Sequence, residues 1–204
     1  IKVTIVSAHE DGKADYSSEV GTLASAGGDA VAVIGYLDQG GKGIIQGSLD
    51  SGAFDTFILS DGMIGDSLTD TFGKSLNKSF GSLPGSTGKG AGVFAKVAGK
   101  AGIDPSGPYT GESYDAAALI VLAMQAGGSA DRGSIAKNVM AVANGPGKKI
   151  YPGQLKKALD LLAKGKAVDY EGATGVVFTD VGEHVGNFLE KEIKGGKFKT
   201  KKQR

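Results

Sequence analysis

The stretch Ala30–Asp61 reads AVAVIGYLDQGGKGIIQGSLDSGAFDTFILSD and carries the clearest fold signal in the chain. Ala30–Gly35 and Thr56–Leu59 are short, continuous apolar runs, which are typical of parallel strands covered on both faces. Gln39–Ser51, between them, has its large apolar residues at helical spacing. A strand, a helix and a strand in this order predict a right-handed crossover that joins two parallel strands.

The same alternation extends in both directions from this stretch. Upstream, Lys2–Ser7 alternates polar and β-branched residues, which predicts a strand, and Asp15–Ala26 is expected to be a helix. Downstream, Ser67–Leu76 predicts a short helix and Ser79–Leu83 a further strand. We therefore expect residues 1–84 to form an α/β domain around a parallel sheet.

Beyond Pro84–Gly88 the pattern changes to successive helices, with no internal repeat. The expected helices are Gly90–Ala101, Gly111–Ala126, Arg132–Ala143 and Pro152–Ala163. Late strands are predicted at Thr174–Phe178 and Phe188–Ile193, followed by a hairpin turn at Gly195 and Gly196. Successive helices with no strand between them do not continue the first sheet. We therefore expect either that an N-terminal portion of the protein is missing from this chain or that these helices leave large apolar faces exposed.

Composition excludes several classes of protein. The 204 residues include 35 Gly and 5 Pro without an every-third-residue period, which excludes collagen. There is no Cys, so disulfides, thiolate catalysis and zinc–cysteine sites are excluded. The longest apolar run, Ala116–Met124, is too short to insert across a bilayer. Net charge is +1, and the basic tail Lys194–Arg204 is interpreted as a solvated end that binds no nucleic acid.

The residues that enzymes use are scarce. His9 and His184 are the only histidines, and each is interpreted as a surface residue. No G-x-S-x-G elbow and no metal-ligand spacing occur, so neither a catalytic site nor a metal or other cofactor is expected. Gly41-x-Gly43-x-x-x-Gly47 loosely resembles a dinucleotide fingerprint, but five residues separate it from the preceding strand. A nucleotide-cofactor α/β enzyme using this turn is the alternative from another functional class.

Tyr36 and Asp61 are the most informative pair, because each directly follows a buried strand. Ligands of open α/β sheets bind outside the carboxyl ends of the strands. A carboxylate beside a phenol suits a ligand with an ammonium group, through a charge-assisted hydrogen bond and a cation–π contact. The competing interpretation is that Asp61 and Gly62 make a turn and that Tyr36 caps the core. Tyr114, an aromatic residue at a helix start, is a third candidate.

Several motifs together resemble the type 1 periplasmic substrate-binding proteins of branched-chain amino-acid ABC transporters. They are DYSSEV at Asp15–Val20, DAVAVIGY at Asp29–Tyr36, LSDGM at Leu59–Met63, DPSGPY at Asp104–Tyr109, SYDAA at Ser113–Ala117 and YEGATGVVF at Tyr170–Phe178. The resemblance covers nearly the whole chain. It implies two Rossmann-like lobes with parallel sheets that close on the ligand about a hinge. It assigns residues 1–84 to the second lobe, 85–179 to a segment returning to the first, and 180–204 to a final crossover to the second.

The resemblance also implies a function and a site. Asp61 takes the place of the acid that binds the amino-acid ammonium, Tyr36 belongs to the same wall, and Tyr114 matches an aromatic contact from the first lobe. The secondary candidates are Gln39, Ser60, Gly62 and Glu112. The expected protein is a monomeric, exported periplasmic binding protein that delivers an amino acid or similar small ligand to an ABC permease.

The resemblance leaves two points open. A receptor-type sensor on the same fold is a further alternative to an importer component. The family's N-terminal part and a signal peptide have no counterpart here, and Ile1 opens directly into a strand pattern, so the chain is expected to be a processed or partial product.

Overall fold

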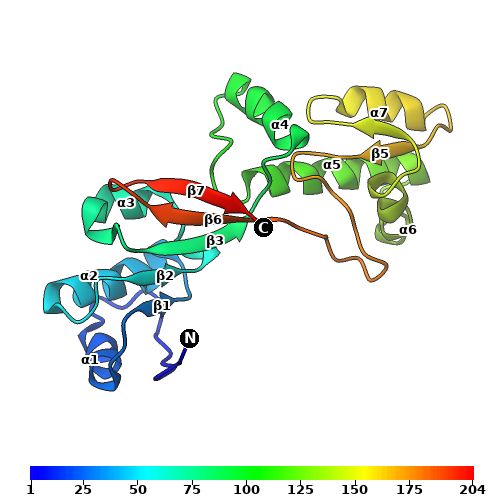
Figure 1. The fold of residues 1–204 in the computed structure, drawn as a ribbon. Helices are drawn as coiled ribbons and strands as arrows, with labels where there is room; N and C mark the ends of the chain where they lie inside the picture. Colours follow the sequence, from blue (N-terminus) through cyan, green and yellow to red (C-terminus); the bar gives the residue numbers. More distant parts are fainter. The chain divides into compact units, whose positions relative to one another are not determined.

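The computed structural model describes residues 1–204, which divide into two compact units (Figure 1). Unit 1 comprises Ile1–Leu83 and Leu189–Arg204, and unit 2 comprises Pro84–Phe188. No helix in either unit combines the length and apolar character needed to cross a lipid bilayer. The sheet of unit 1 therefore contains strands from two parts of the chain, one before unit 2 in the sequence and one after it.

Unit 1 is an α/β unit built on a five-stranded sheet. Its elements are α1 (Ser17–Ala26), β1 (Val31–Val33), the turn η1 (Leu37–Gly41), α2 (Lys42–Ser51), β2 (Phe57–Leu59), the turn η2 (Asp61–Met63), α3 (Asp66–Phe72), the turn η3 (Gly73–Leu76), β3 (Phe80–Pro84), β6 (Phe188–Ile193) and β7 (Phe198–Gln203). The strand order is β1-β2-β3-β6-β7, with β1, β2 and β3 parallel and the β6–β7 hairpin antiparallel. The predicted pairing of β1 with β2 is confirmed, with Val33 opposite Leu59.

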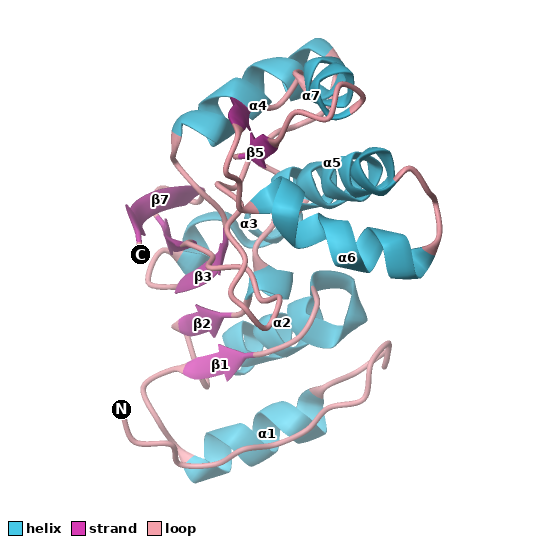
Figure 2. Ribbon diagram, turned by 90° about the vertical axis from the view of Figure 1, so that its right-hand side faces the viewer, coloured by secondary structure: helices cyan, strands magenta, loops and turns pink.

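The core of unit 1 lies on one face of this sheet. Val20 of α1, Ile45 of α2 and Leu68 of α3 join the inward residues of β1 and β2 in a single buried cluster, and Figure 2 shows α2 alongside these strands. The opposite face stays open, since Ile34 is 80% and Phe80 44% exposed. The expectation that these strands are covered on both faces is therefore wrong for this chain, because all three helices contribute to the same side.

The predicted strand Lys2–Ser7 is also wrong, although the segment follows the edge of β1. The Thr4 hydroxyl donates a hydrogen bond to the Gly27 carbonyl at 2.8 Å, and the His9 ring lies beside Gly35. A strand requires a ladder of backbone hydrogen bonds. Here a side chain makes the contact with the loop before β1, so residues 1–10 remain irregular despite their alternation.

Unit 2 is mostly helical, with a small sheet that the sequence did not predict. Its elements are α4 (Lys89–Lys100), α5 (Thr110–Gly127), α6 (Arg132–Ala143), β4 (Lys148–Ile150), α7 (Leu155–Leu162) and β5 (Val168–Tyr170). β4 and β5 pair in parallel, with Ile150 opposite Tyr170. Each strand has only three residues and includes charged ones, so neither an apolar run nor a clear alternation marks it.

These two strands help to cover the helices of unit 2, so the expected large apolar exposure is not found. Leu119 and Leu122 of α5 are buried against α6 and the strands. The partly buried residues of the same cluster include Ile135, Val139, Leu155 and Leu162. The exposed large apolar side chains of α5 are Ile120 and Val121, which are 48% and 39% exposed.

The predicted late strands have different outcomes. The strand Phe188–Ile193 is confirmed as β6, and the chain turns at Gly195 and Gly196, both with positive φ, into β7. The strand predicted at Thr174–Phe178 is wrong. It begins as a turn in which Gly175 has φ +74°, followed by an isolated bridge between Phe178 and His184. The backbone N–H of Thr174 binds a carboxylate of α5, which removes it from any ladder.

Candidate functional site

Tyr36 and Asp61 lie at the carboxyl ends of the neighbouring parallel strands β1 and β2. Tyr36 follows β1 by three residues and Asp61 follows β2 by two, so the crossover brings both to one edge of the sheet. The Tyr36 side chain is 63% exposed, which is inconsistent with a residue that caps the core. Asp61 opens the turn η2 and accepts a hydrogen bond from the Gly62 N–H at 2.8 Å through Oδ1.

Ser60 joins the two strand ends. Its hydroxyl accepts a hydrogen bond from the Gly35 N–H at 3.3 Å and lies 3.2 Å from the Gly35 carbonyl, to which it can donate. Its own N–H donates to the Val33 carbonyl at 3.2 Å. The hydroxyl is used within the protein, so Ser60 acts here by fixing the spacing between Tyr36 and Asp61.

Gly62 allows Tyr36 to lie against the turn that carries Asp61. A Cβ atom at Gly62 would overlap the Gly35 carbonyl and come within 2.8 Å of Cδ1 of the Tyr36 ring. This is closer than carbon atoms approach without a bond, so only glycine fits at this position. The phenol and the carboxylate thus belong to adjoining turns in direct contact.

Gln39 and the following glycines form the wide turn η1 between β1 and α2. Gln39 is exposed, and its N–H donates to the Tyr36 carbonyl at 3.3 Å. Gly41 and Gly43 pack against protein side chains, since a Cβ atom would overlap the Met63 thioether at the first and the Tyr16 ring at the second. Core packing therefore accounts for both glycines, which weakens the resemblance of this turn to a dinucleotide-binding loop.

Unit 2 holds the remaining predicted residues, Tyr114 and Glu112, in the first turns of α5. The Tyr114 ring packs against Phe94 with centroids 5.3 Å apart, and its hydroxyl accepts a hydrogen bond from the Gly153 N–H at 2.8 Å. Tyr114 is half-buried, and Glu112 is also partly exposed. Tyr114 therefore connects α5 to α4 and to the loop before α7, which is a packing role within the unit.

Asp115, the residue after Tyr114, has a structural role that the sequence did not predict. It is 2% exposed, and its carboxylate accepts hydrogen bonds from the Tyr170 hydroxyl and from the N–H groups of Ala173 and Thr174, at 2.8–3.0 Å. The Thr174 hydroxyl donates to it at 2.8 Å. Burial, and secondarily Asp115, raise the pKa of Tyr170 far above its usual value. The hydrogen bonds of Asp115 thus hold the turn after β5 against α5.

The structure brings five of the predicted site residues together and leaves two in the other unit. The residues Tyr36, Gln39, Ser60, Asp61 and Gly62 lie at the β1–β2 edge of unit 1. Tyr114 and Glu112 lie on α5 of unit 2. No group of three or more His, Asp and Glu side chains converges where a metal ion could bind. A carboxylate and a phenol at one edge of the sheet are groups that can attract a small cation.

Solved structures of other proteins share the fold of this chain. The leucine-binding protein LivK from Thermotoga maritima superposes with a TM-score of 0.68 over 94% of this chain, at 18% sequence identity. A type 1 periplasmic binding protein from Bordetella pertussis superposes with a TM-score of 0.63 over 93%, at 19% identity. The chain has the fold of the type 1 periplasmic binding proteins. It spans about half the length of these solved structures, covering 49% and 50% of them.

The sequence also gives a partial match to a curated protein. The chemotactic signal transduction substrate-binding protein BasB from Halobacterium salinarum is 35% identical over 98 residues, which is 48% of this chain and 24% of that protein. No family model matches the sequence. A structure from Rhodospirillum rubrum that is named for a branched-chain amino-acid ABC transporter superposes with a TM-score of 0.57 over 93% of this chain, at 12% identity. The resemblance that the motifs indicated is thus found at the level of the fold.

Proposed function

We propose that this chain belongs to an exported, non-enzymatic binding protein that captures an amino acid through its α-ammonium group. The observation that carries the proposal is the contact between the turns that hold Tyr36 and Asp61 at the β1–β2 edge. A carboxylate and an aromatic face are the two protein groups that attract an ammonium ion most directly. The edge also lies where ligands of parallel α/β sheets bind.

The side chain of the proposed amino-acid ligand is a separate question from its ammonium group. The fold neighbours include proteins named for leucine and for branched-chain amino acids, which favours an apolar side chain in the ligand. We infer that Tyr36 also covers part of that side chain, because its ring is largely exposed beside Gly62. Tyr114 and Glu112 belong to unit 2, and their candidacy as ligand-binding residues rests on the family resemblance alone.

Two roles are open to such a protein. Delivery of the ligand to the permease of an ABC importer is the one we favour, because one fold neighbour is named for a branched-chain amino-acid ABC transporter. A receptor-type sensor is the second candidate, favoured by the partial similarity to a chemotactic substrate-binding protein. Both roles use the same ligand site.

The proposal is tested by a binding screen of the full-length protein. Thermal-shift measurements with the proteinogenic L-amino acids, NAD, NADP and ATP should show stabilisation by one or a few apolar amino acids and by no nucleotide. A ligand that binds only the folded protein stabilises it by RT ln(1 + [L]/Kd), so the melting temperature rises with the logarithm of ligand concentration above Kd. Calorimetry on the hits would then give the affinities. Stabilisation by a nucleotide with no response to any amino acid would favour the cofactor-enzyme alternative instead.

A further inference from the structure

Met63 is fully buried, yet it belongs to the turn η2 that carries Asp61. Its thioether packs on Gly41 of η1, where a Cβ atom would overlap Sδ of Met63. The same Cβ atom would come within 2.8 Å of the Tyr36 carbonyl oxygen. The Met63 side chain therefore extends from the turn of Asp61 to the turn that follows Tyr36.

Leu37 makes the reciprocal contact between the two turns. It follows Tyr36 directly and is partly buried against the same apolar cluster that contains Met63. Its side chain lies beside Gly65, just after η2, where a Cβ atom would be 2.9 Å from Cδ1 of Leu37. Each turn thus supplies one apolar side chain that packs on a glycine beside the other. Close contacts of this kind are lost if either turn shifts alone.

Backbone hydrogen bonds connect this packing to the two candidate ligand-binding groups. The Gly41 N–H donates to the Tyr36 carbonyl at 3.1 Å, and the Met63 N–H donates to the Ser60 carbonyl at 3.0 Å. The first bond closes a loop that begins at Tyr36, and the second closes a loop that contains Asp61. The contact between Met63 and Gly41 joins these two loops.

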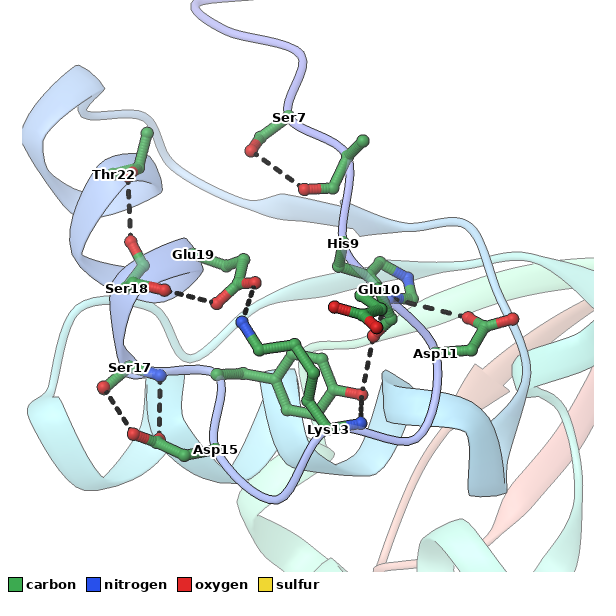
Figure 3. A network of polar contacts seen from close by, with 12 residues as sticks. Ser7, His9, Glu10, Asp11, Lys13, Asp15, Ser17, Ser18, Glu19 and Thr22 are labelled. Atoms are coloured by element: carbon green, nitrogen blue, oxygen red, sulfur yellow. Dashed lines mark hydrogen bonds and ion pairs between the residues drawn. The ribbon is translucent and has the colours of Figure 1, made fainter.

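The turn η1 also packs on Tyr16, which is 4% exposed. A Cβ atom at Gly40 would overlap the Tyr16 hydroxyl. That hydroxyl donates to the Glu10 carbonyl at 3.0 Å and accepts a hydrogen bond from the Lys13 N–H at 3.1 Å, in the network that Figure 3 shows. The adjacent glycines of η1 thus contact two different buried side chains, Tyr16 and Met63, and only Met63 comes from the turn of Asp61.

We propose that Met63 is a positioning residue for ligand binding, which holds Asp61 and Tyr36 at the spacing that an amino acid requires. Its side chain is fully buried, so it acts through these two residues and not by touching the ligand. A site whose groups are already in place binds more tightly, because ordering them on binding costs free energy. This inference rests on the proposed amino-acid site.

The experiment compares Met63→Ala with Leu76→Ala in the full-length protein. Both substitutions truncate a fully buried side chain of the same apolar cluster, so similar losses of stability are expected. Leu76 ends η3, before β3, and so lies away from the carboxyl ends of the strands. L-Leucine is titrated by calorimetry at a temperature where circular dichroism shows both variants folded. Binding should weaken about tenfold in Met63→Ala, the size expected when two side chains must be ordered again, and less than about twofold in Leu76→Ala.

Two further variants separate positioning from loss of core volume. Met63→Leu keeps an apolar atom at the position of Sδ, so its affinity should be within about twofold of the wild type. Leu37→Ala removes the reciprocal contact at a partly buried residue, so it should weaken binding by about two- to fivefold with a smaller loss of stability. Equal affinities of Met63→Ala and Leu76→Ala overturn the inference, as does a Met63→Leu variant that binds no better than Met63→Ala.

A readout in the ligand-free protein separates this inference from the proposed function. The Tyr36 ring lies against Gly62, so nuclear Overhauser contacts between the ring protons and the Gly62 Hα protons are expected in the wild type and in Leu76→Ala. Met63→Ala should lose them. If the wild type binds no amino acid but these contacts still depend on Met63, the proposed function fails and the positioning of Tyr36 by Met63 stands. If leucine binds and the contacts persist in Met63→Ala, the positioning role fails alone.

Discussion

Asp61 in unit 1 and Asp115 in unit 2 are both acidic residues beside a tyrosine, yet their surroundings differ. Asp115 is 2% exposed, and four donors from Tyr170, Ala173 and Thr174 fill its acceptor capacity. Asp61 is partly exposed at a strand end, where its turn contacts the exposed Tyr36. A carboxylate of the first kind holds the fold, and we propose that the second kind meets a ligand.

The largest effect that separates the two acids is on stability. Asp115→Ala should destabilise unit 2 by at least about 3 kcal/mol, because each buried donor left without a partner costs about 1–3 kcal/mol. Asp61→Ala should change the free energy of unfolding by less than about 1 kcal/mol, since surface substitutions rarely cost more. Urea denaturation of both variants measures the difference. Equal destabilisation would mean that Asp61 also has a structural role.

Tyr114 and Tyr36 should show the same contrast in stability, with a smaller difference between them. Tyr114→Ala removes the contact with Phe94 and the acceptor of the Gly153 N–H, so it should cost about 1–3 kcal/mol of stability, less than a fully buried aromatic residue would. Tyr36→Ala, at a 63% exposed side chain, should leave stability nearly unchanged and weaken ligand binding. Denaturation midpoints and calorimetric affinities for the same two variants check both statements. Loss of stability at Tyr36 would make it a core residue after all.

A third acid, Glu19, is paired with a cation and should show its effect through pH. The Lys13 ammonium, by hydrogen bonding, lowers the pKa of Glu19 to about 2 from the 4.5 of an unperturbed carboxyl. Because the folded-state pKa is the lower one, this stabilisation is fully present above pH 4.5 and is lost as the pH falls through about 2. The stability difference between wild type and Glu19→Gln should therefore shrink on acidification. A difference that is constant from pH 7 to 2 would contradict this pairing.

Glu19→Gln has a matched control in the exposed pair of Asp38 and Lys42, four residues apart. The Asp38 side chain is 83% exposed, so Asp38→Asn should change stability little at any pH. Both variants remove one carboxylate from unit 1. A pH effect seen only in Glu19→Gln therefore belongs to its pair with Lys13.

The sequence was sufficient to predict which residues of the candidate site lie at the ends of strands. β1 and β2 are recognisable in the sequence as apolar runs. Residues just after such runs lie at the carboxyl edge of a parallel sheet, so Tyr36 and Asp61 were predictable as neighbours. Packing across longer separations was not predictable. Ser60 binds Gly35 from 25 residues away, and Asp115 binds Thr174 from 59.

Other predictions from the sequence failed for physical reasons. Lys2–Ser7 has the alternation of a strand, but it forms no ladder of backbone hydrogen bonds, so the predicted strand is absent. β4 and β5 have three residues each and carry charges, so periodicity could not reveal them. His9 was predicted to be a surface residue, whereas its side chain is only 17% exposed beside Tyr16 and Gly35, a contact between distant residues that no sequence pattern indicates.

Recognition of an ammonium group by Asp61 is the central claim, and one thermodynamic cycle tests it directly. L-Leucine and its deaminated analogue 4-methyl-2-oxopentanoate are titrated into the wild type and into Asp61→Asn. The wild type should prefer leucine by about a hundredfold or more, because an uncompensated buried charge costs about 3–5 kcal/mol. Asp61→Asn should lose most of that preference while keeping its stability. If Asp61→Asn discriminates between the two ligands as strongly as the wild type, Asp61 does not bind the ammonium and the account of the site is wrong.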